Sequence, residues 1–113
     1  MAGGAGDDII RGDAGQDRVD GGLGDDILTG GAGKDVFVFK ANFGHDTIED
    51  FRTCGFSGDH IEFDHSLFAN FSAVLAASEQ DGDDVVITLD NDNSVVIKDV
   101  VLTHLHESDF RFV

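Results

Sequence analysis

Apolar side chains recur at every ninth residue in the first part of the chain. Ile10, Val19, Leu28 and Phe37 each occupy the eighth position of a nine-residue unit, and four such units run without interruption from Gly3 to Val38. Every unit also has glycine at its fourth position and aspartate at its sixth position. Similarity at a fixed period is the sequence signature of a solenoid, in which each repeat buries its apolar face against the next. The pattern therefore predicts short strands joined by glycine-rich turns.

Each unit divides into a six-residue turn and a three-residue strand. Glycines at positions one, two and four allow the left-handed backbone conformations of a tight turn; Asp13 replaces the second glycine of the second unit. If two units make one coil, units eighteen residues apart stack on the same side of the roll. This arrangement places Asp8 beside Asp26 and Asp17 beside Asp35.

The stacked aspartates indicate a bound cation. Carboxylates held at the strand spacing of about 4.8 Å repel each other unless an ion lies between them. Ca²⁺ takes about six to eight oxygen ligands from carboxylates and backbone carbonyls, whereas Mg²⁺ demands a tighter octahedron and keeps its waters. We therefore expect each aspartate pair to share a calcium ion with the carbonyl groups of both turns.

Two further segments repeat the pattern less exactly. Phe43–Ile48 keeps the glycine, the aspartate and the apolar residue, and it is predicted to stack over the third unit; Gly58–Phe63 is a weaker copy. Asp50 and Asp59 are additional candidate ligands, with solvated carboxylates at strand ends as the alternative. The candidate calcium ligands, carboxylates and turn carbonyls together, are Asp8, Asp17, Asp26, Asp35, Asp46, Gly4, Gly6, Asp13, Gly15, Gly22, Gly24, Gly31, Gly33, Gly44, Asp50 and Asp59.

The period changes after the repeats. Ser66–Ser78 has apolar residues at helical spacing, with Asp64 or Ser66 as the predicted N-cap. Val85–Leu89 alternates between apolar and polar residues, and Ser94–Lys98 returns after a polar turn, so the two form a predicted β-hairpin. The expected fold is all-β: a parallel β-roll closed by a C-terminal capping helix and hairpin. Residues 1–65 would form the roll and residues 66–113 the cap, within one structural domain.

Composition narrows the possible functions. The chain has 113 residues and a formal charge of −16, which disfavours nucleic acid and anionic membranes as partners and favours cations. Cys54 is the single cysteine, so no internal disulfide forms, and bound metal is the expected staple. No apolar stretch is long enough to span a membrane. The start, Met1–Gly3, lacks the pattern of a signal peptide and opens almost inside a repeat, as expected of a piece of a longer array.

The motifs of familiar catalysts are missing from the sequence. It contains neither H-E-x-x-H, the zinc motif of metalloproteases, nor the G-x-S-x-G of serine hydrolases. Cys54 has no recognisable catalytic motif around it. We therefore expect a binding module and not an enzyme.

The four nonapeptides, FGHDTIEDF at Phe43–Phe51, GDHIEF at Gly58–Phe63 and the closing DFRFV together resemble the C-terminal calcium-binding domain of repeats-in-toxin (RTX) secreted proteins, especially the serralysin type. The resemblance implies that the repeat aspartates bind calcium. It also implies that the protein is secreted to the extracellular space by type I secretion machinery, through an uncleaved C-terminal signal. Asp109–Val113 approximates such a signal, with Arg111 as a departure. An upstream passenger domain of the same polypeptide would carry the activity.

These observations support one main hypothesis and leave two others open. The main hypothesis is a calcium switch, in which the module stays unfolded inside the cell and folds outside, stabilising its passenger. The alternative is a module that binds polysaccharide or a cell surface, although the chain lacks Trp and Tyr and its phenylalanines are better interpreted as core. The uncapped N-terminal coil could also pair edge to edge in a homodimer.

Overall fold

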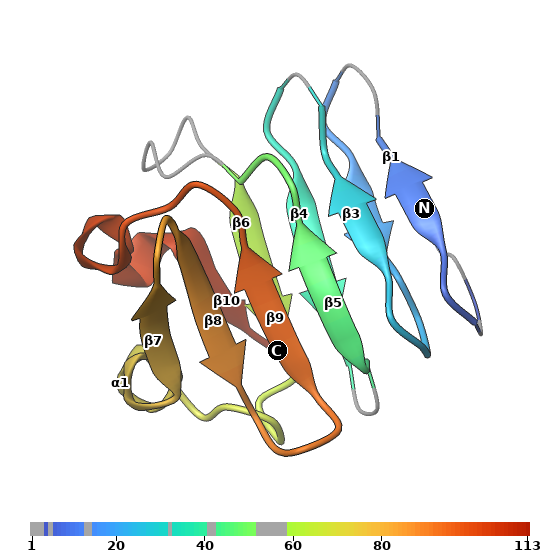
Figure 1. The fold of residues 1–113 in the computed structure, drawn as a ribbon. Helices are drawn as coiled ribbons and strands as arrows, with labels where there is room; N and C mark the ends of the chain where they lie inside the picture. Colours follow the sequence, from blue (N-terminus) through green and yellow to red (C-terminus); the bar gives the residue numbers. More distant parts are fainter. Residues whose placement is uncertain (1–3, 5, 13–14, 32, 41–42, 52–58) are drawn as a thin grey trace.

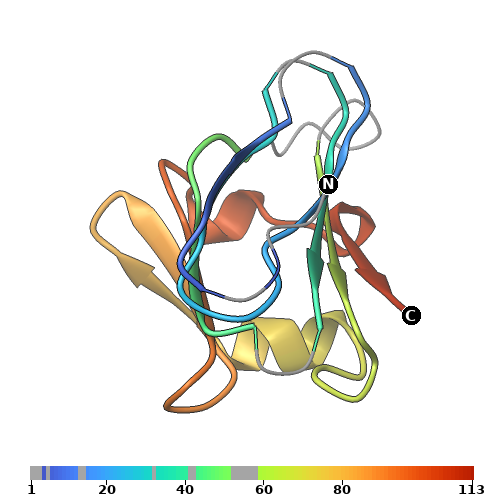
Figure 2. The same ribbon diagram turned by 90° about the vertical axis from the view of Figure 1, so that its right-hand side faces the viewer.

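Two β-sheets face each other across a roll (Figures 1 and 2). The computed structural model describes residues 4, 6–12, 15–31, 33–40, 43–51 and 59–113. The larger sheet has the strand order β1-β3-β5-β9-β8-β7, and the smaller sheet has the order β10-β6-β4-β2. The strands are β1 (Ile9–Arg11), β2 (Arg18–Asp20), β3 (Ile27–Thr29), β4 (Val36–Phe39), β5 (His45–Ile48), β6 (His60–Phe63), β7 (Ser78–Asp81), β8 (Asp84–Thr88), β9 (Ser94–Ile97) and β10 (Phe110–Phe112).

Successive strands of the repeats alternate between the two sheets, so each pair of repeats makes one coil. Ile10 lies beside Leu28 in a parallel pair, and Val19 lies beside Phe37 in the other sheet. The predicted eighteen-residue stacking is therefore confirmed. The fifth, irregular repeat also stacks where expected, because β5 pairs with β3 and places Ile48 beside Leu28.

The core is one layer of inward side chains between the sheets. Val19, Leu28 and Phe37 are fully buried, as are the residues stacked beyond them. Towards the C-terminal end the core widens into a cluster of phenylalanine rings, which includes Phe63 stacked on Phe110. Every phenylalanine in the described part of the chain is buried or half-buried. This supports their interpretation as core residues.

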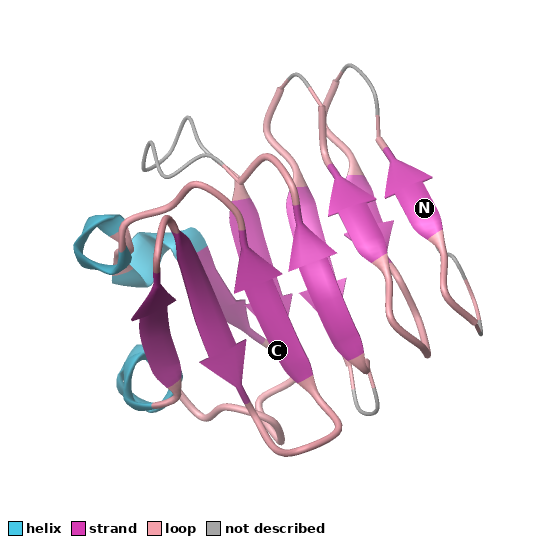
Figure 3. Cartoon of the chain, viewed as in Figure 1, coloured by secondary structure: helices cyan, strands magenta, loops and turns pink. Residues whose placement is uncertain are grey.

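Strands and short helices close the C-terminal end of the roll (Figure 3). The predicted hairpin is confirmed: β8 and β9 pair antiparallel, and β9 continues the large sheet by pairing in parallel with β5. The strand β7 adds an antiparallel edge that the sequence analysis did not predict. Two 3-10 helices, η2 (Leu102–His104) and η3 (Glu107–Asp109), lead into β10, which pairs in parallel with β6.

The capping helix is shorter than predicted. α1 spans Phe71–Ala76, and its N-cap is Asn70, whose side-chain oxygen accepts the N–H of Ala73 at 3.0 Å. The expected caps are therefore wrong: the Asp64 carboxylate instead accepts the backbone N–H and the hydroxyl of Ser66, which holds a separate turn before the helix.

One amide side chain joins the hairpin to the C-terminal segment. The Gln80 amide nitrogen faces the carbonyl oxygens of Gly82, Asp84 and Val100 at 3.1, 2.9 and 3.1 Å. Its oxygen accepts the N–H of Leu102 at 2.7 Å. Gln80 therefore links the β7–β8 turn to the start of η2.

None of the helices in the described ranges has the length and apolar character needed to cross a membrane.

Candidate metal centre

The aspartates at position six form two columns, one along each side of the roll. The first aspartate column is Asp8, Asp26 and Asp46. The Oδ1 atom of Asp26 accepts the backbone N–H of Asp8, and that of Asp46 accepts the N–H of Asp26, both at 2.9 Å. Each carboxylate therefore ties its own coil to the preceding coil.

The second aspartate column repeats this arrangement on the other side. It consists of Asp17, Asp35 and Asp59. Asp17 donates its N–H to Oδ1 of Asp35 at 3.0 Å, and Asp35 donates to Oδ1 of Asp59 at 2.9 Å. Asp59 is fully buried, so its alternative interpretation as a solvated carboxylate is wrong.

The second carboxylate oxygen is buried without a partner in most members of both columns. The Oδ2 atoms of Asp8, Asp17, Asp26 and Asp35 have no hydrogen-bond partner within the described part of the chain. Buried polar atoms are normally paired, because leaving one unpaired costs free energy. Four buried oxygens with negative charge fit a cation held in the turns.

The glycine turns bring backbone carbonyls close to the columns. Gly24 has a φ of 98°, and a Cβ there would overlap the carbonyl oxygen of Gly6 one coil earlier. The carbonyl oxygen of Gly30 approaches Gly12 in the same way. Positive φ values occur at all the glycines predicted as carbonyl ligands, namely Gly4, Gly6, Gly15, Gly22, Gly24, Gly31, Gly33 and Gly44. The turns therefore supply the mixture of carboxylate and carbonyl oxygens that calcium prefers.

Burial opposes the negative charge of the columns. Together with the charges of neighbouring aspartates, which contribute less, it raises the pKa of Asp46 to about 8 and that of Asp35 to about 6. Burial also raises the pKa of Asp26, and the charge of Asp8 adds to this effect. A divalent cation would remove the repulsion that otherwise favours protonation of these carboxylates.

Side chains alone do not complete a metal site in the described residues. No group of three or more His, Cys, Asp or Glu side chains lies close enough there to hold an ion. The repeat pattern assigns the remaining coordination to carbonyl oxygens of the turns, and this assignment stays a prediction.

Asp50 is placed differently from the column residues. Its two carboxylate oxygens accept the N–H groups of Gly30 and Gly31, at 2.9 and 2.8 Å. It thus supports the turn of the fourth repeat, and its role as a ligand stays a prediction. Asp13, another predicted ligand, lies outside the described residues.

A third ladder was missed from the sequence. Asp7 accepts the N–H of Asp25 at 2.8 Å, and Asp25 accepts the N–H of His45 at 3.0 Å, both on the exposed surface. The consecutive aspartates at positions five and six of the first and third units were the available signal. Next to this ladder, the side-chain oxygen of Asn93, which precedes β9, accepts the N–H of Gly44 at 3.0 Å.

Comparison with known families identifies the repeats. The model of the RTX calcium-binding nonapeptide repeat matches residues 2–37 in four copies. The chain carries RTX repeats. RTX nonapeptide repeats bind Ca²⁺ and are a non-catalytic motif, which agrees with the oxygen-rich turns described above.

The roll as a whole is similar to a solved structure. The chain is similar to the extracellular lipase LipA from Serratia marcescens, with a TM-score of 0.73 and 26% sequence identity. The similarity covers 99% of this chain but 21% of the lipase, so the chain spans about a fifth of that protein. This similarity and the strand order of the two sheets confirm the predicted all-β roll. No match was found among curated proteins.

Proposed function

We propose that this chain is a calcium-dependent folding module, which folds on calcium binding outside the cell and serves the secretion and stability of a passenger on the same polypeptide. The observation that carries the proposal is the pair of aspartate columns with buried, unpartnered carboxylate oxygens. These oxygens destabilise the roll unless a cation is bound.

The ligands we assign are the members of the two aspartate columns and the carbonyl oxygens of the adjacent glycine turns. When bound, calcium supplies positive charge between stacked carboxylates. The columns then hold neighbouring coils together through both the ion and the Oδ1 hydrogen bonds. Extracellular calcium modules bind with Kd values of roughly 10⁻⁴ to 10⁻³ M. A site at about ten times its Kd contributes about 1.4 kcal/mol, so several sites together decide the folding of a marginal domain.

The proposed secretion role rests on the comparison and on the charge of the chain. Where free calcium is low, repulsion among the carboxylates keeps the three-residue strands unfolded, as export in an unfolded state requires. The related lipase is described as extracellular, and it extends well beyond the region it shares with this chain. We assign any catalytic activity to such an additional region, and export to type I secretion machinery.

Folding in the presence and absence of calcium tests the switch directly. We expect the circular dichroism signal of β-structure to appear on calcium addition, and amide exchange in β1 to β5 to slow at the same time. Bound calcium is counted by isothermal titration calorimetry. A roll that is equally protected in chelator and in calcium would overturn the proposal.

Edge-to-edge pairing of two copies stays a prediction. β1 and β2 are edge strands of the two sheets, and Ile9 on β1 is 70% exposed. Sedimentation at several protein concentrations would detect the dimer. The polysaccharide-binding alternative gains no support from the phenylalanines, since none of those described is exposed.

A further inference from the structure

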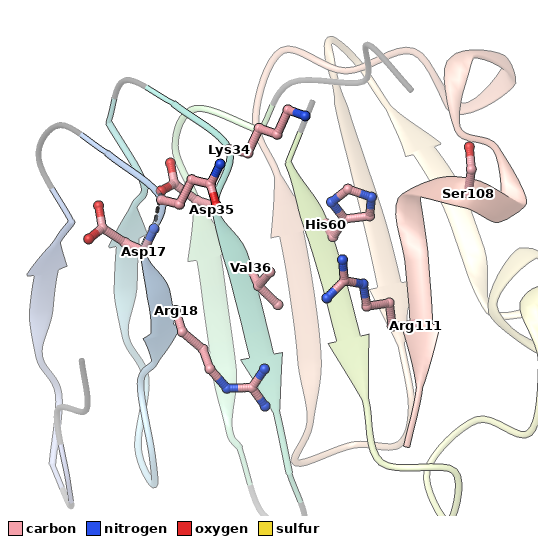
Figure 4. Close-up of a pocket in the computed structure, with 9 residues that line it drawn as sticks. Asp17, Arg18, Lys34, Asp35, Val36, His60, Ser108 and Arg111 are labelled. Carbon is pink, nitrogen blue, oxygen red and sulfur yellow. Dashed lines mark hydrogen bonds between the residues drawn. The ribbon is translucent and has the colours of Figure 1, made fainter. Parts of the chain in front are cut away.

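A groove of about 460 Å³ lies on the smaller sheet, beside the second aspartate column. Basic and polar side chains dominate its wall: Gln16, Arg18, Lys34, His60, Ser108 and Arg111. Figure 4 shows Arg111 and His60 pointing into the same region, with Lys34 extending from the turn before β4. The groove is unusual because the chain as a whole carries a charge of −16.

Strand pairing brings these residues together from distant parts of the sequence. Arg18 lies beside Val36 in the register of β2 and β4, and Val36 lies beside His60 in that of β4 and β6. Arg111 follows in the register of β10 and β6, opposite Glu62. These positions alternate with the buried row of Val19, Phe37, Ile61 and Phe110, so their side chains face away from the core.

The cations of the groove differ in how they are paired. Arg18 forms an ion pair with the buried Glu62, and that pair fixes its guanidinium. Lys34 and Arg111, in contrast, form no ion pair with any described residue. Two unpaired positive charges in one groove of a strongly acidic protein are complementary to an anion.

We propose that this groove binds a tetrahedral oxyanion, namely a phosphate or sulfate group, either free or esterified. Arg111 supplies the planar fork of N–H donors that suits such a group, and Lys34 adds a point charge. Ser108 and Gln16 provide neutral donors from two other segments of the wall. Donors arriving from several directions match a tetrahedral group better than a planar carboxylate.

Anion binding at the groove is coupled to calcium. Asp17 and Asp35 of the second aspartate column also line it, and their two negative charges offset those of Lys34 and Arg111. Calcium on that column cancels the carboxylate charges and leaves the groove positive. By linkage, each ligand must then raise the affinity for the other. This coupling rests on the proposed calcium site, whereas the proposal that the groove binds an anion does not.

The first experiment measures anion binding to the calcium-loaded chain by calorimetry, with sodium sulfate and glucose 6-phosphate as probes and sodium chloride at equal ionic strength as the reference. We expect saturable binding of both probes. Similar affinities would show that the groove recognises the charged group alone, and tighter glucose 6-phosphate would show that it recognises an ester. Absence of saturable binding for both would overturn the proposal.

A matched pair of variants locates the site. Arg111→Gln should weaken sulfate binding about tenfold, as expected for loss of one charged hydrogen bond. Arg11→Gln removes the same charge from the exposed strand β1 and should leave binding unchanged. If Arg111→Gln fails to fold in calcium by circular dichroism, Lys34→Gln replaces it. Equal weakening by the groove variant and by Arg11→Gln would overturn the assignment.

Calcium titrations with and without sulfate separate this proposal from the proposed function. We expect sulfate to raise the calcium affinity of the unaltered chain and of Arg11→Gln, but not that of Arg111→Gln. A chain that binds calcium normally and ignores sulfate would overturn the groove alone. A chain that binds sulfate but no calcium would overturn the calcium switch and the coupling, and leave the groove standing.

Discussion

At the residue scale, the two oxygens of a column aspartate have different environments. In Asp26, Oδ1 accepts the N–H of the preceding coil, while Oδ2 is buried and unpartnered in the described structure. In the proposed calcium switch, the first oxygen sets the register of the stack, whereas the second disfavours folding until a cation is bound. One side chain therefore links the geometry of the repeat to its dependence on calcium.

Replacing Asp26 with Asn should separate these two effects. The amide oxygen still accepts the N–H of Asp8, but the site loses a charged ligand, so calcium affinity should fall about tenfold or more. In calcium-free solution the same change should raise stability slightly, because it removes repulsion within the column. Calorimetric calcium titration measures the first effect, and the fraction of chain folded in chelator, read by circular dichroism, measures the second.

Asp83→Asn provides the control for that change. Asp83 is exposed in the turn between β7 and β8, so its loss changes the net charge equally without touching a column. Calcium affinity that falls as much in Asp83→Asn as in Asp26→Asn would contradict the assigned role of Asp26.

The close stacking of turns predicts a strong effect at Gly24. Alanine there suffers from both the positive φ of 98° and an overlap with the Gly6 carbonyl oxygen. Gly82 has a φ of 61° but open space around its Cβ position. We expect Gly82→Ala to cost about 1 kcal/mol from backbone strain alone and Gly24→Ala roughly 3 kcal/mol or more. Denaturant unfolding in calcium compares the stability of the two variants. Similar losses would show that neighbouring turns move apart easily to accommodate the methyl group of Gly24→Ala.

At the scale of elements, the C-terminal region that closes the roll depends on local features that differ from those of the repeats. α1 has only six residues, so its N-cap and its buried Val74 matter more than its intrinsic helix propensity. The helix contacts the roll at the end where the phenylalanine cluster lies. Stability of this end should respond to changes in the cap residue.

Asn70→Ala tests the observed start of the helix. The substitution removes the acceptor for the N–H of Ala73 and should destabilise the calcium-bound chain by about 1 kcal/mol. Thermal unfolding measures the loss, and Asn91→Ala in the exposed turn before β9 serves as the neutral comparison. An unchanged Asn70→Ala, or a larger loss in Asp64→Ala, would favour the earlier helix start predicted from the sequence.

The repeats were predictable from the sequence because their period fixes both the register and the inward side chains. Leu28 and Phe37 each follow their stacking partner, Ile10 and Val19, by eighteen residues, so the period alone identifies these pairs. β7 was missed because Ser78–Asp81 is polar and mostly exposed at a sheet edge, so it lacks the alternation that marks a half-buried strand. The basic groove was missed because it depends on how β10 aligns with β6, and no repeat relates those two strands.

At the scale of the whole molecule, pH should have opposite effects with and without calcium. The pKa of Asp35 is raised to about 6 and that of Asp46 to about 8, both from 3.8. The calcium-free fold therefore binds protons more tightly than the unfolded chain, and this stabilisation is complete below about pH 4. It is lost as pH rises through about 6 and then about 8. Calcium competes with these protons, so calcium affinity should rise over the same window.

The fraction of metal-stripped protein that is folded, read by circular dichroism between pH 4 and pH 8, measures the first trend, and calcium titration measures the second. Asp46→Asn is the control, since it should flatten the loss of stability at the upper end of the window. Calcium-free protein that gains stability as pH rises would contradict the prediction.

The Gln80 amide has a further consequence for the lifetime of the folded chain. Its nitrogen faces three carbonyl oxygens, so hydrolysis of the amide to glutamate would place a negative oxygen where donors are required. The size and shape of the side chain would hardly change, but the group that faces the carbonyls would change from a hydrogen-bond donor to a negatively charged acceptor. Slow deamidation at this position would therefore loosen the join between the hairpin and the C-terminal segment. Gln80 is thus a point at which chemical ageing, independent of any ligand, would limit how long the hairpin and the C-terminal segment stay joined.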